Sequence, residues 1–305
     1  MKKSPSYLNL NKAQLERRIR DAYRILLSCE LCPHKCRVNR IAGEQGKCRS
    51  TAQVMVSSYN AHFGEEPPLS GVQGSGTIFF TNCTLHCRFC QNYPISQLGN
   101  GNQVTISELA AMMMDLQKRG CHNINLVTPT HFVPQIIAAL AQAREQGLTI
   151  PIVYNTSGYE AVNTLKLLEN IVDIYLPDAK YADDLIARKY SSAHNYFVVL
   201  KDALKEMHRQ VGDLKVDRHG LAQSGLIIRH LILPDNLAGT DKVLPWIAEN
   251  ISKNTYISLM SQYFPAYQAM NEPALSRGIT RKEYQEARAI LRKCGLENGW
   301  LQQNS

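Results

Sequence analysis

From about residue 74 onward, short apolar segments alternate with amphipathic ones, and this alternation constrains the fold more than any other feature of the sequence. The apolar segments predict six strands, over residues 78–81, 123–127, 150–154, 171–176, 225–233 and 255–259. The segments between them predict helices over residues 105–120, 134–144, 160–168, 196–207 and 242–250, followed by a last helix that Thr280 caps. Because the strands are apolar along nearly their whole length, we expect a parallel sheet covered by helices.

Six β/α units are too few for a closed eight-stranded barrel. Right-handed crossovers between parallel strands, with helices packed on the sheet, fit an open, partial barrel instead. The predicted fold class is therefore α/β, a partial (β/α)6 TIM-like barrel. Its active site should lie at the carboxyl ends of the strands, as it does in barrels generally.

Polar side chains follow the predicted strands at the ends where an active site is expected. They include Thr128 and Thr130, Asn155 and Ser157, Asp178 and Lys180, and, within the fifth strand, Arg229. One polar residue at a strand end is ordinarily a helix cap or a surface residue. Polar ends on successive strands predict a cavity that orients a charged ligand.

Three cysteines, Cys83, Cys87 and Cys90, come directly after the first predicted strand with the spacing Cys-x3-Cys-x2-Cys. Three thiolates can hold a [4Fe–4S] cluster, and because such a cluster has four irons, one iron stays open for a small molecule. The alternatives are a zinc site or three unrelated thiols. Zinc sites ordinarily use paired cysteines and four ligands, and this spacing lacks the second pair.

This cysteine spacing at the end of a first strand resembles that of the radical S-adenosylmethionine (SAM) superfamily, whose architecture is the partial (β/α)6 barrel. The resemblance implies that the three cysteines hold a [4Fe–4S] cluster and that SAM binds its open iron. A reductant such as flavodoxin or ferredoxin would then drive cleavage of SAM to a 5′-deoxyadenosyl radical, while the protein orients both cofactors. Phe89, the aromatic residue between Cys87 and Cys90, stands where this family packs a ring near the adenine.

Residues 154–159, residues 178–180 and Arg229 more closely resemble the pyruvate formate-lyase activating enzymes and their relatives with an N-terminal four-cysteine segment. This resemblance implies a partner protein, a glycyl-radical enzyme that loses a hydrogen atom from one glycine. It implies catalytic roles for Lys180 and Arg229. It also implies cofactor-binding roles for Phe89, Thr128, Thr130, Asn155, Ser157, Asp178 and Arg229.

Two positions depart from the pattern of the activating enzymes. Thr128-Pro129-Thr130 stands where that family has a Gly-Gly-Glu-like turn that holds the amino group of SAM. Asn155 stands where the activating enzymes have an acidic residue beside a monovalent cation. The sequence therefore predicts a cofactor pocket that differs in detail from theirs.

A second cysteine group precedes the barrel, with the spacing Cys29-x2-Cys32-x3-Cys36-x11-Cys48. A helix capped by Asn11 comes before it, and the loop-rich segment is too small to bury a core of its own. A metal would supply folding free energy, and four thiolates suit either zinc or an auxiliary iron–sulfur cluster. We predict two domains, a metal-binding segment over residues 1–72 and the partial barrel with its C-terminal helix over residues 73–305.

The composition excludes several classes of protein. The 305 residues are 44% hydrophobic and 20% charged, which is typical of globular proteins. Nine cysteines in a chain without an apolar signal region indicate metal sites rather than disulfides and predict a cytoplasmic location. No apolar run approaches the length of a membrane span. The net charge of +8 arises from scattered basic residues, so nucleic acid is not the expected partner.

The leading hypothesis is a radical SAM enzyme that abstracts a hydrogen atom, with a glycyl-radical enzyme as its target. A second hypothesis has the same radical act on a small molecule or on RNA. A third is non-enzymatic, an iron–sulfur electron-transfer protein or a zinc scaffold. Reductive cleavage of SAM would separate the first two hypotheses from the third.

Overall fold

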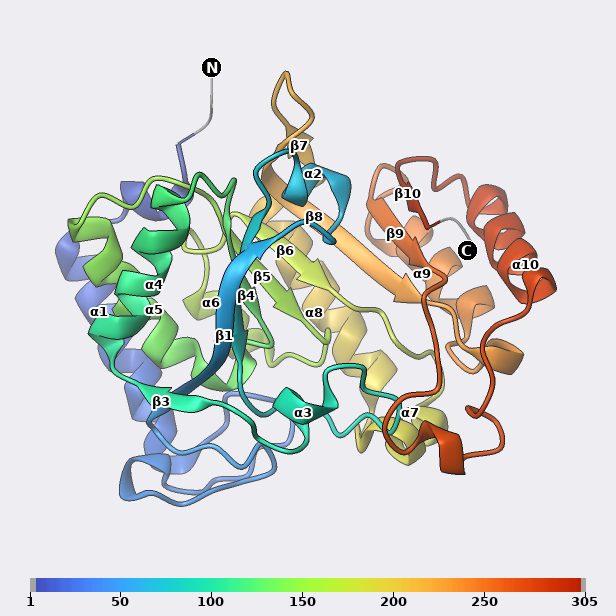
Figure 1. Cartoon of the computed structure of the whole chain (residues 1–305), viewed down its shortest axis with the longest axis horizontal. Helices are drawn as coiled ribbons and strands as arrows, with labels where there is room; N and C mark the ends of the chain where they lie inside the picture. Colours follow the sequence, from blue (N-terminus) through green and yellow to red (C-terminus); the bar gives the residue numbers. More distant parts are fainter. Residues whose placement is uncertain (1–3, 303–305) are drawn as a thin grey trace.

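One curved, ten-stranded sheet organises the structure, a computed structural model that describes residues 4–302. Six neighbouring strands run parallel in the order β9-β8-β6-β5-β4-β2 (Figure 1). Their bounds are β2 (Ser75–Phe80), β4 (Ile124–Val127), β5 (Ile152–Thr156), β6 (Ile174–Pro177), β8 (Ala222–Leu231) and β9 (Tyr256–Met260). These are the six predicted strands with their ends shifted by a few residues, and the predicted partial barrel is confirmed.

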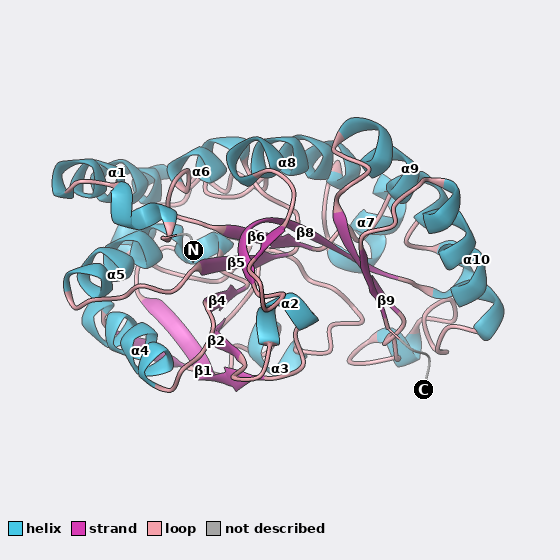
Figure 2. Cartoon of the chain, turned by 90° about the horizontal axis from the view of Figure 1, so that it is seen from above, coloured by secondary structure: helices cyan, strands magenta, loops and turns pink. Residues whose placement is uncertain are grey.

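Helices cover the outer face of the sheet, and Figure 2 shows them as an arc around the strands. They are α1 (Lys12–Ile25), α4 (Ile106–Lys118), α5 (Val133–Glu145), α6 (Val162–Leu167), α8 (Tyr196–Val211), α9 (Thr240–Asn250) and α10 (Arg281–Lys293). Capping boxes begin three of them, at Asn11, Thr105 and Thr280, as the sequence predicts. A further helix, α7 (Asp184–Ser191), was not predicted; Asp183 caps it.

The sheet extends beyond the six parallel strands at both edges. At one edge, β1 (Val54–His62) pairs antiparallel with β2, and β3 (Asn102–Val104) pairs antiparallel with β1. At the other, β10 (Gly299–Leu301) pairs parallel with β9. The short β7 (Lys215–Val216) lies off this strand order and pairs antiparallel with the first residues of the interior strand β8. Since β1 precedes residue 72, the segment predicted as a separate N-terminal domain contributes a strand to the barrel sheet.

The amino-terminal mouth of the partial barrel is filled by apolar side chains. The short helix α2 (Pro67–Ser70) places Leu69 there, fully buried among side chains of the strands. The residues that pack with it include Val153, Ile174, Leu176, Ala222 and Ile227. The polar strand ends therefore lie at the opposite, carboxyl end, beside the short helix α3 (Tyr93–Ser96) (Figure 1). Among the described helices, none is both long and apolar enough to cross a membrane.

Candidate functional site

The three cysteines lie on a loop, here called the cluster loop (residues 81–92), that leaves the carboxyl end of β2. Each sulfur has a polar neighbour. The Leu85 amide donates to Cys83 Sγ at 3.3 Å, Ser191 Oγ donates to Cys87 Sγ at 3.0 Å, and Cys90 Sγ lies 3.0 Å from Ser96 Oγ. Hydrogen bonds of this kind stabilise sulfur that carries negative charge, as a cluster ligand does.

Burial shapes the chemistry of these thiols. It raises the pKa of Cys83 strongly and that of Cys87 to about 11, with neighbouring cysteines raising both and Lys180 opposing the rise. Coordination to iron deprotonates a thiol whatever its free pKa. Among the described residues no three His, Cys, Asp or Glu side chains converge on a metal position. The fit of a cluster therefore rests on the donor set: three sulfurs at one cavity, each with a polar neighbour.

The cysteines line one wall of a cavity of about 210 Å³, here called the cluster cavity. The opposite wall comes from the carboxyl ends of β4, β5, β6, β8 and β9. Six of the predicted site residues lie on it: Thr128, Asn155, Ser157, Asp178, Lys180 and Arg229. The structure thus brings together side chains that are up to 146 positions apart in the chain, from Cys83 to Arg229.

Asp178 is the centre of a buried ion-pair network in this cavity. Its Oδ1 accepts from Arg229 Nε at 2.7 Å, and its Oδ2 accepts from Lys180 Nζ at 2.6 Å. Burial alone would raise the pKa of Asp178, but the two cations hold that pKa below its usual value. The pKa of Lys180 is raised, because Asp178 and Cys87 outweigh the effect of burial. All three side chains are therefore charged at neutral pH.

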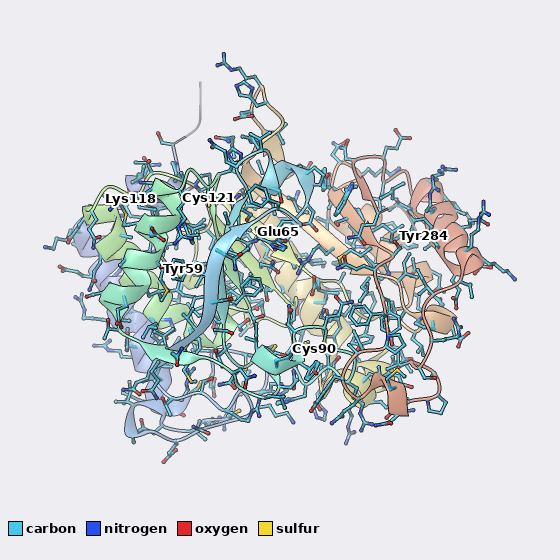
Figure 3. All side chains as sticks on the ribbon, viewed as in Figure 1. Tyr59, Glu65, Cys90, Lys118, Cys121 and Tyr284 are labelled. Carbon is cyan, nitrogen blue, oxygen red and sulfur yellow. The ribbon has the colours of Figure 1, made fainter. Side chains whose placement is uncertain are left out.

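Arg229 is held on three sides. Besides Asp178, its guanidinium donates to Asn155 Oδ1 at 2.6 Å and lies 3.6 Å from Glu65 Oε2. Glu65 reaches it from the loop between β1 and α2. Figure 3 shows Glu65 nearer the middle of the sheet than Cys90, which lies at the carboxyl end. Burial raises the pKa of Glu65 to about 7, against the lowering effect of Arg229.

The backbone at two strand ends adopts conformations that shape the cavity. Thr128 has a φ of 59°, a left-handed conformation that is unfavourable for a β-branched residue and typical of functional sites. Gly158 has a φ of 75°, and a Cβ there would lie 2.5 Å from the carbonyl oxygen of Asp178. Only glycine therefore allows the turn after β5 to approach Asp178 so closely.

Thr130, for which the sequence predicts a cofactor-binding role, is not among the residues that line the cluster cavity. It is 1% exposed, and its hydroxyl donates to Glu160 Oε1 at 2.5 Å. Thr156 and Tyr154 also donate to the Glu160 carboxylate. Burial raises the pKa of Glu160 to about 7 in spite of these hydrogen bonds. The Thr130 hydroxyl is thus engaged by the buried Glu160 carboxylate rather than by the cluster cavity.

Phe89 faces the cluster cavity and is held by aromatic neighbours. Its ring lies edge-on to Tyr263 at 5.8 Å and to Tyr181 at 6.4 Å between centroids. These contacts fix the ring at the cavity wall, where it offers an apolar surface.

Sequence reasoning missed Glu65, Glu160 and Tyr181. The acid pair before Pro67-Pro68 was the available signal for the first, and nothing in the local sequence marked the other two.

The four-cysteine segment packs against the cluster loop (Figure 1). His34 Nε2 lies 2.8 Å from the carbonyl oxygen of Thr84, and His86 Nε2 lies 3.0 Å from that of Lys47. Asn82 Nδ2 donates to Ser50 Oγ at 3.2 Å. These contacts therefore hold in position the loop that carries Cys83, Cys87 and Cys90, which we call the bracing role of the segment.

Within this segment, the four thiols are near neighbours. Burial raises the pKa of Cys32 strongly, and Cys29, Cys36 and Cys48 raise it further. The Lys47 amide donates to Cys36 Sγ at 3.2 Å. The segment's own apolar core is small, with Leu26, Cys29 and Leu31 as its buried members. A metal bound by the four sulfurs would add the stabilisation that so small a core lacks.

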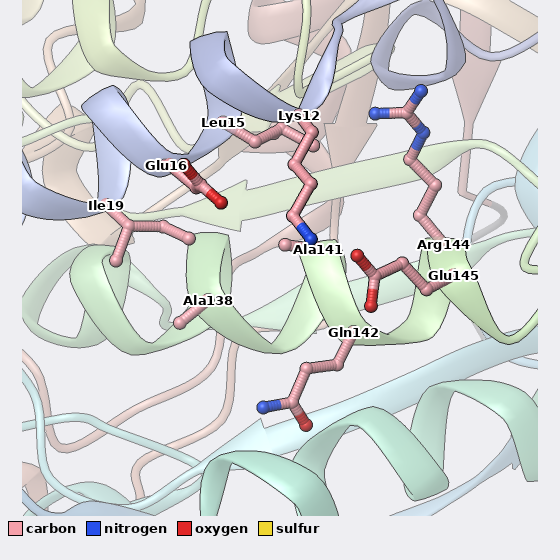
Figure 4. A pocket seen from close by; sticks show the side chains of 9 residues that line it. All are labelled: Lys12, Leu15, Glu16, Ile19, Ala138, Ala141, Gln142, Arg144 and Glu145. Carbon is pink, nitrogen blue, oxygen red and sulfur yellow. The ribbon is translucent and has the colours of Figure 1, made fainter.

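A separate hollow of about 470 Å³ lies between α1 and α5 (Figure 4). Small and aliphatic residues form its floor, and Lys12, Glu16, Arg144 and Glu145 stand around it. It contains no cysteine and shares no lining residue with the cluster cavity. We regard it as the seam between two packed helices rather than a site of chemistry.

Comparison with known proteins agrees with this geometry. The sequence model of the radical SAM superfamily matches residues 77–220, which contain the cluster loop and the strands from Thr77 of β2 through β6. An uncharacterized protein of Methanocaldococcus jannaschii is 30% identical over 289 residues, which are 93% of this chain and 80% of that protein.

Solved structures share the fold at low identity. HydG, a maturase of the [FeFe]-hydrogenase, is 11% identical with a TM-score of 0.53 over 98% of this chain. HydG from Carboxydothermus hydrogenoformans is 12% identical with a TM-score of 0.51 over 73% of this chain. This chain spans 59% of the first HydG chain and 52% of the second, so the likeness concerns the fold.

Proposed function

The chain belongs to the radical SAM superfamily, and from that premise we propose that it abstracts a hydrogen atom from a glycine of a partner protein. Membership of the superfamily implies a [4Fe–4S] cluster and SAM. When bound, they supply a 5′-deoxyadenosyl radical after one-electron reduction. The observation that carries the proposal is that Cys83, Cys87 and Cys90 share one cavity with the charged triad of Asp178, Lys180 and Arg229.

The residues of the cavity would orient SAM. Cys83, Cys87 and Cys90 would hold the cluster, and Phe89 would pack against the adenine. Lys180 and Arg229 are cations that suit a carboxylate, and Asp178 suits an amino group. Asn155, Ser157 and Thr128 offer amide, hydroxyl and backbone groups to the ribose. Because Asp178 pairs with both Arg229 and Lys180, the charged groups of the pocket hold one another in fixed positions.

The glycine target rests on the likeness of residues 154–159, residues 178–180 and Arg229 to the pyruvate formate-lyase activating enzymes. A reductant of the flavodoxin or ferredoxin class would supply the electron. We place this activity in the cytoplasm, since a cluster and nine thiols suit a reducing compartment.

We further propose that Cys29, Cys32, Cys36 and Cys48 bind zinc as a structural ion. The contacts of His34 and of Lys47 with the cluster loop support a bracing role. An auxiliary iron–sulfur cluster is the competing occupant, because it takes the same four thiolates.

Deuterium transfer tests the proposed function. A candidate glycyl-radical enzyme is produced with α-deuterated glycine and incubated anaerobically with the reconstituted protein, SAM and dithionite. We expect deuterium in the 5′-deoxyadenosine formed and a protein-centred radical by electron paramagnetic resonance. Cleavage of SAM without deuterium transfer from any such partner would contradict the glycine target.

A further inference from the structure

An open groove lies beside the cluster cavity, here called the lateral groove. It is formed by the loop after β9, by α10 and by β10, and its volume is about 1530 Å³. Pockets for small molecules are commonly about 300–1000 Å³, so the groove is larger than a small ligand needs. Gln91 and Gln262 line both the groove and the cluster cavity. The two spaces therefore adjoin each other.

Side-chain amides fix the wall between the two spaces. Gln91 Nε2 donates to the carbonyl oxygen of Gln262 at 3.0 Å, and Gln302 Nε2 donates to Gln262 Oε1 at 2.8 Å. The loop after β9 is also tied to the cluster loop, since the Gln268 amide donates to the carbonyl oxygen of Arg88 at 2.9 Å. An occupant of the groove is thus held at a set position relative to the cluster loop.

The groove has one sign of charge. Arg281 and Arg288 line it, and none of the described residues that line it is acidic. Arg288 packs over the ring of Tyr284 at 5.7 Å, and its buried Nε has no hydrogen-bond partner among residues 4–302. Neither arginine makes an ion pair with any other described residue, whereas Arg277 nearby has two carboxylate partners. The groove therefore complements an anionic occupant.

We propose that the lateral groove binds an acidic polypeptide segment of the protein substrate, next to the glycine that enters the cluster cavity. This inference rests on the proposed function and adds the recognition surface for its substrate. Gln262 and Gln302 carry both donor and acceptor atoms, as a peptide backbone requires. Phe264, which is 53% exposed, and Trp300 supply apolar surface for side chains of the segment.

A single-stranded nucleic acid fits the groove less well. Strand binding relies on exposed aromatic faces and on several phosphate contacts. Of the four described aromatic residues that line the groove, Phe264 is exposed and Trp300 is partly exposed. Tyr263 and Tyr284 are buried, and their hydroxyls donate to the carbonyl oxygens of Leu275 and Gln302. Two arginines would reach few phosphates. The amides and the limited positive charge favour a peptide.

Fluorescence anisotropy with defined probes tests the inference on the full-length protein reconstituted with iron and sulfide. The probe is a labelled octapeptide of glutamate and serine around one glycine. The comparison probes are the same peptide with lysine for glutamate and a labelled RNA octamer. We expect the acidic peptide to bind about tenfold more tightly than either comparison probe, a difference of about 1.4 kcal/mol.

The double variant Arg281→Glu/Arg288→Glu should lose that preference, with folding checked by circular dichroism. The control Arg17→Glu/Arg20→Glu makes the same change of charge on exposed residues of α1 and should retain it. An equal affinity of the acidic peptide for wild type and the groove variant would overturn the inference, as would tighter binding of RNA. If the wild type cleaves SAM but does not prefer the acidic peptide, the proposed role of the lateral groove is wrong and the proposed function is unaffected. A preference without SAM cleavage contradicts the proposed function and supports the groove.

Discussion

The carboxylate of Asp178 joins both cations of the cluster cavity, so its charge is the part of the site most sensitive to substitution. Asp178→Asn keeps the shape but removes the charge that pairs with Lys180 and Arg229. We expect the free energy of unfolding to fall by about 3–5 kcal/mol, since a buried ion pair loses one partner. We expect SAM affinity to fall by about 1.5–3 kcal/mol, the value of a hydrogen bond to a charged group.

Urea unfolding and calorimetric titration of SAM would measure these two effects. Asp202→Asn, on the exposed face of α8, is the matched control and should change neither quantity. Unchanged SAM affinity in the Asp178→Asn protein would show that the cofactor pocket lies elsewhere.

Glu160 makes stability depend on pH with a definite sign. Its folded-state pKa is raised to about 7 from the ordinary 4.5, because burial disfavours the charged form. The folded protein therefore binds this proton more tightly than the unfolded chain does. The resulting stabilisation is complete below about pH 4.5 and is lost as the pH rises through about 7.

Chemical denaturation at pH 5 and pH 8 tests this account of Glu160. Glu160→Gln has no carboxyl group to titrate at this position, so its free energy of unfolding should not show this decrease. The difference in free energy of unfolding, variant minus wild type, should therefore be larger at pH 8 than at pH 5 by on the order of 3 kcal/mol. The exposed Glu297→Gln variant should follow wild type. Parallel pH curves for wild type and Glu160→Gln would contradict the raised pKa.

The sequence predicted much of the site at the residue scale. Asp178, Lys180 and Arg229 meet in one cavity, because the carboxyl ends of parallel strands share one edge of a sheet. The sequence could not show that Thr130 is buried against Glu160, because Glu160 lies on another loop and the contact depends on tertiary packing. Glu65 was missed because it reaches Arg229 from the loop between β1 and α2, and the acid pair before Pro67-Pro68 was its one signal in the sequence.

Among the elements, the four-cysteine segment is the one whose folding should depend on metal. We expect about four irons and one zinc per chain in anaerobically prepared protein if zinc is bound, and about eight irons if the site holds a second cluster. Cys32→Ser should lose the zinc. Because His34 and Lys47 contact the cluster loop, it should also lower the iron content.

Metal analysis of wild type and Cys32→Ser would measure the zinc and iron content per chain. Cys294→Ser is the control, since Cys294 lies at the C-terminal end of α10 and outside both cysteine groups. Iron content unchanged in Cys32→Ser would contradict the bracing role of the segment. Iron content near eight in wild type would replace zinc with an auxiliary cluster.

The strands that sequence reasoning missed have recognisable physical causes. β1 contains a bulge between Val56 and Ser58, which breaks the alternation that would otherwise mark a half-buried strand. β10 has only three residues and begins at Gly299, so its sequence carries little strand signal. By contrast, the six central strands are apolar along most of their length and were predicted, because burial on both faces leaves a nearly continuous pattern.

At the scale of the whole molecule, the N-terminal segment and the barrel share structure. β1 forms an edge of the barrel sheet, and Leu69 fills its amino-terminal mouth. A chain that begins at residue 73 would lose both, together with Tyr7, whose hydroxyl donates to the carbonyl oxygen of Ile150 at 3.0 Å. We expect this shortened chain to be unfolded or aggregated, as measured by circular dichroism and gel filtration. A cooperative, monomeric fold of residues 73–305 would contradict this expectation and support the predicted boundary at residue 72.

The central claim is that Cys83, Cys87 and Cys90 hold a cluster that cleaves SAM. The most direct measurement is the yield of 5′-deoxyadenosine from SAM and dithionite, under strictly anaerobic conditions, with reconstituted wild type and the triple Cys→Ala variant. We predict product from wild type, and neither product nor the iron–sulfur absorption of this site from the variant, with its folded secondary structure retained. Formation of 5′-deoxyadenosine by the triple variant at the rate of wild type would contradict the account.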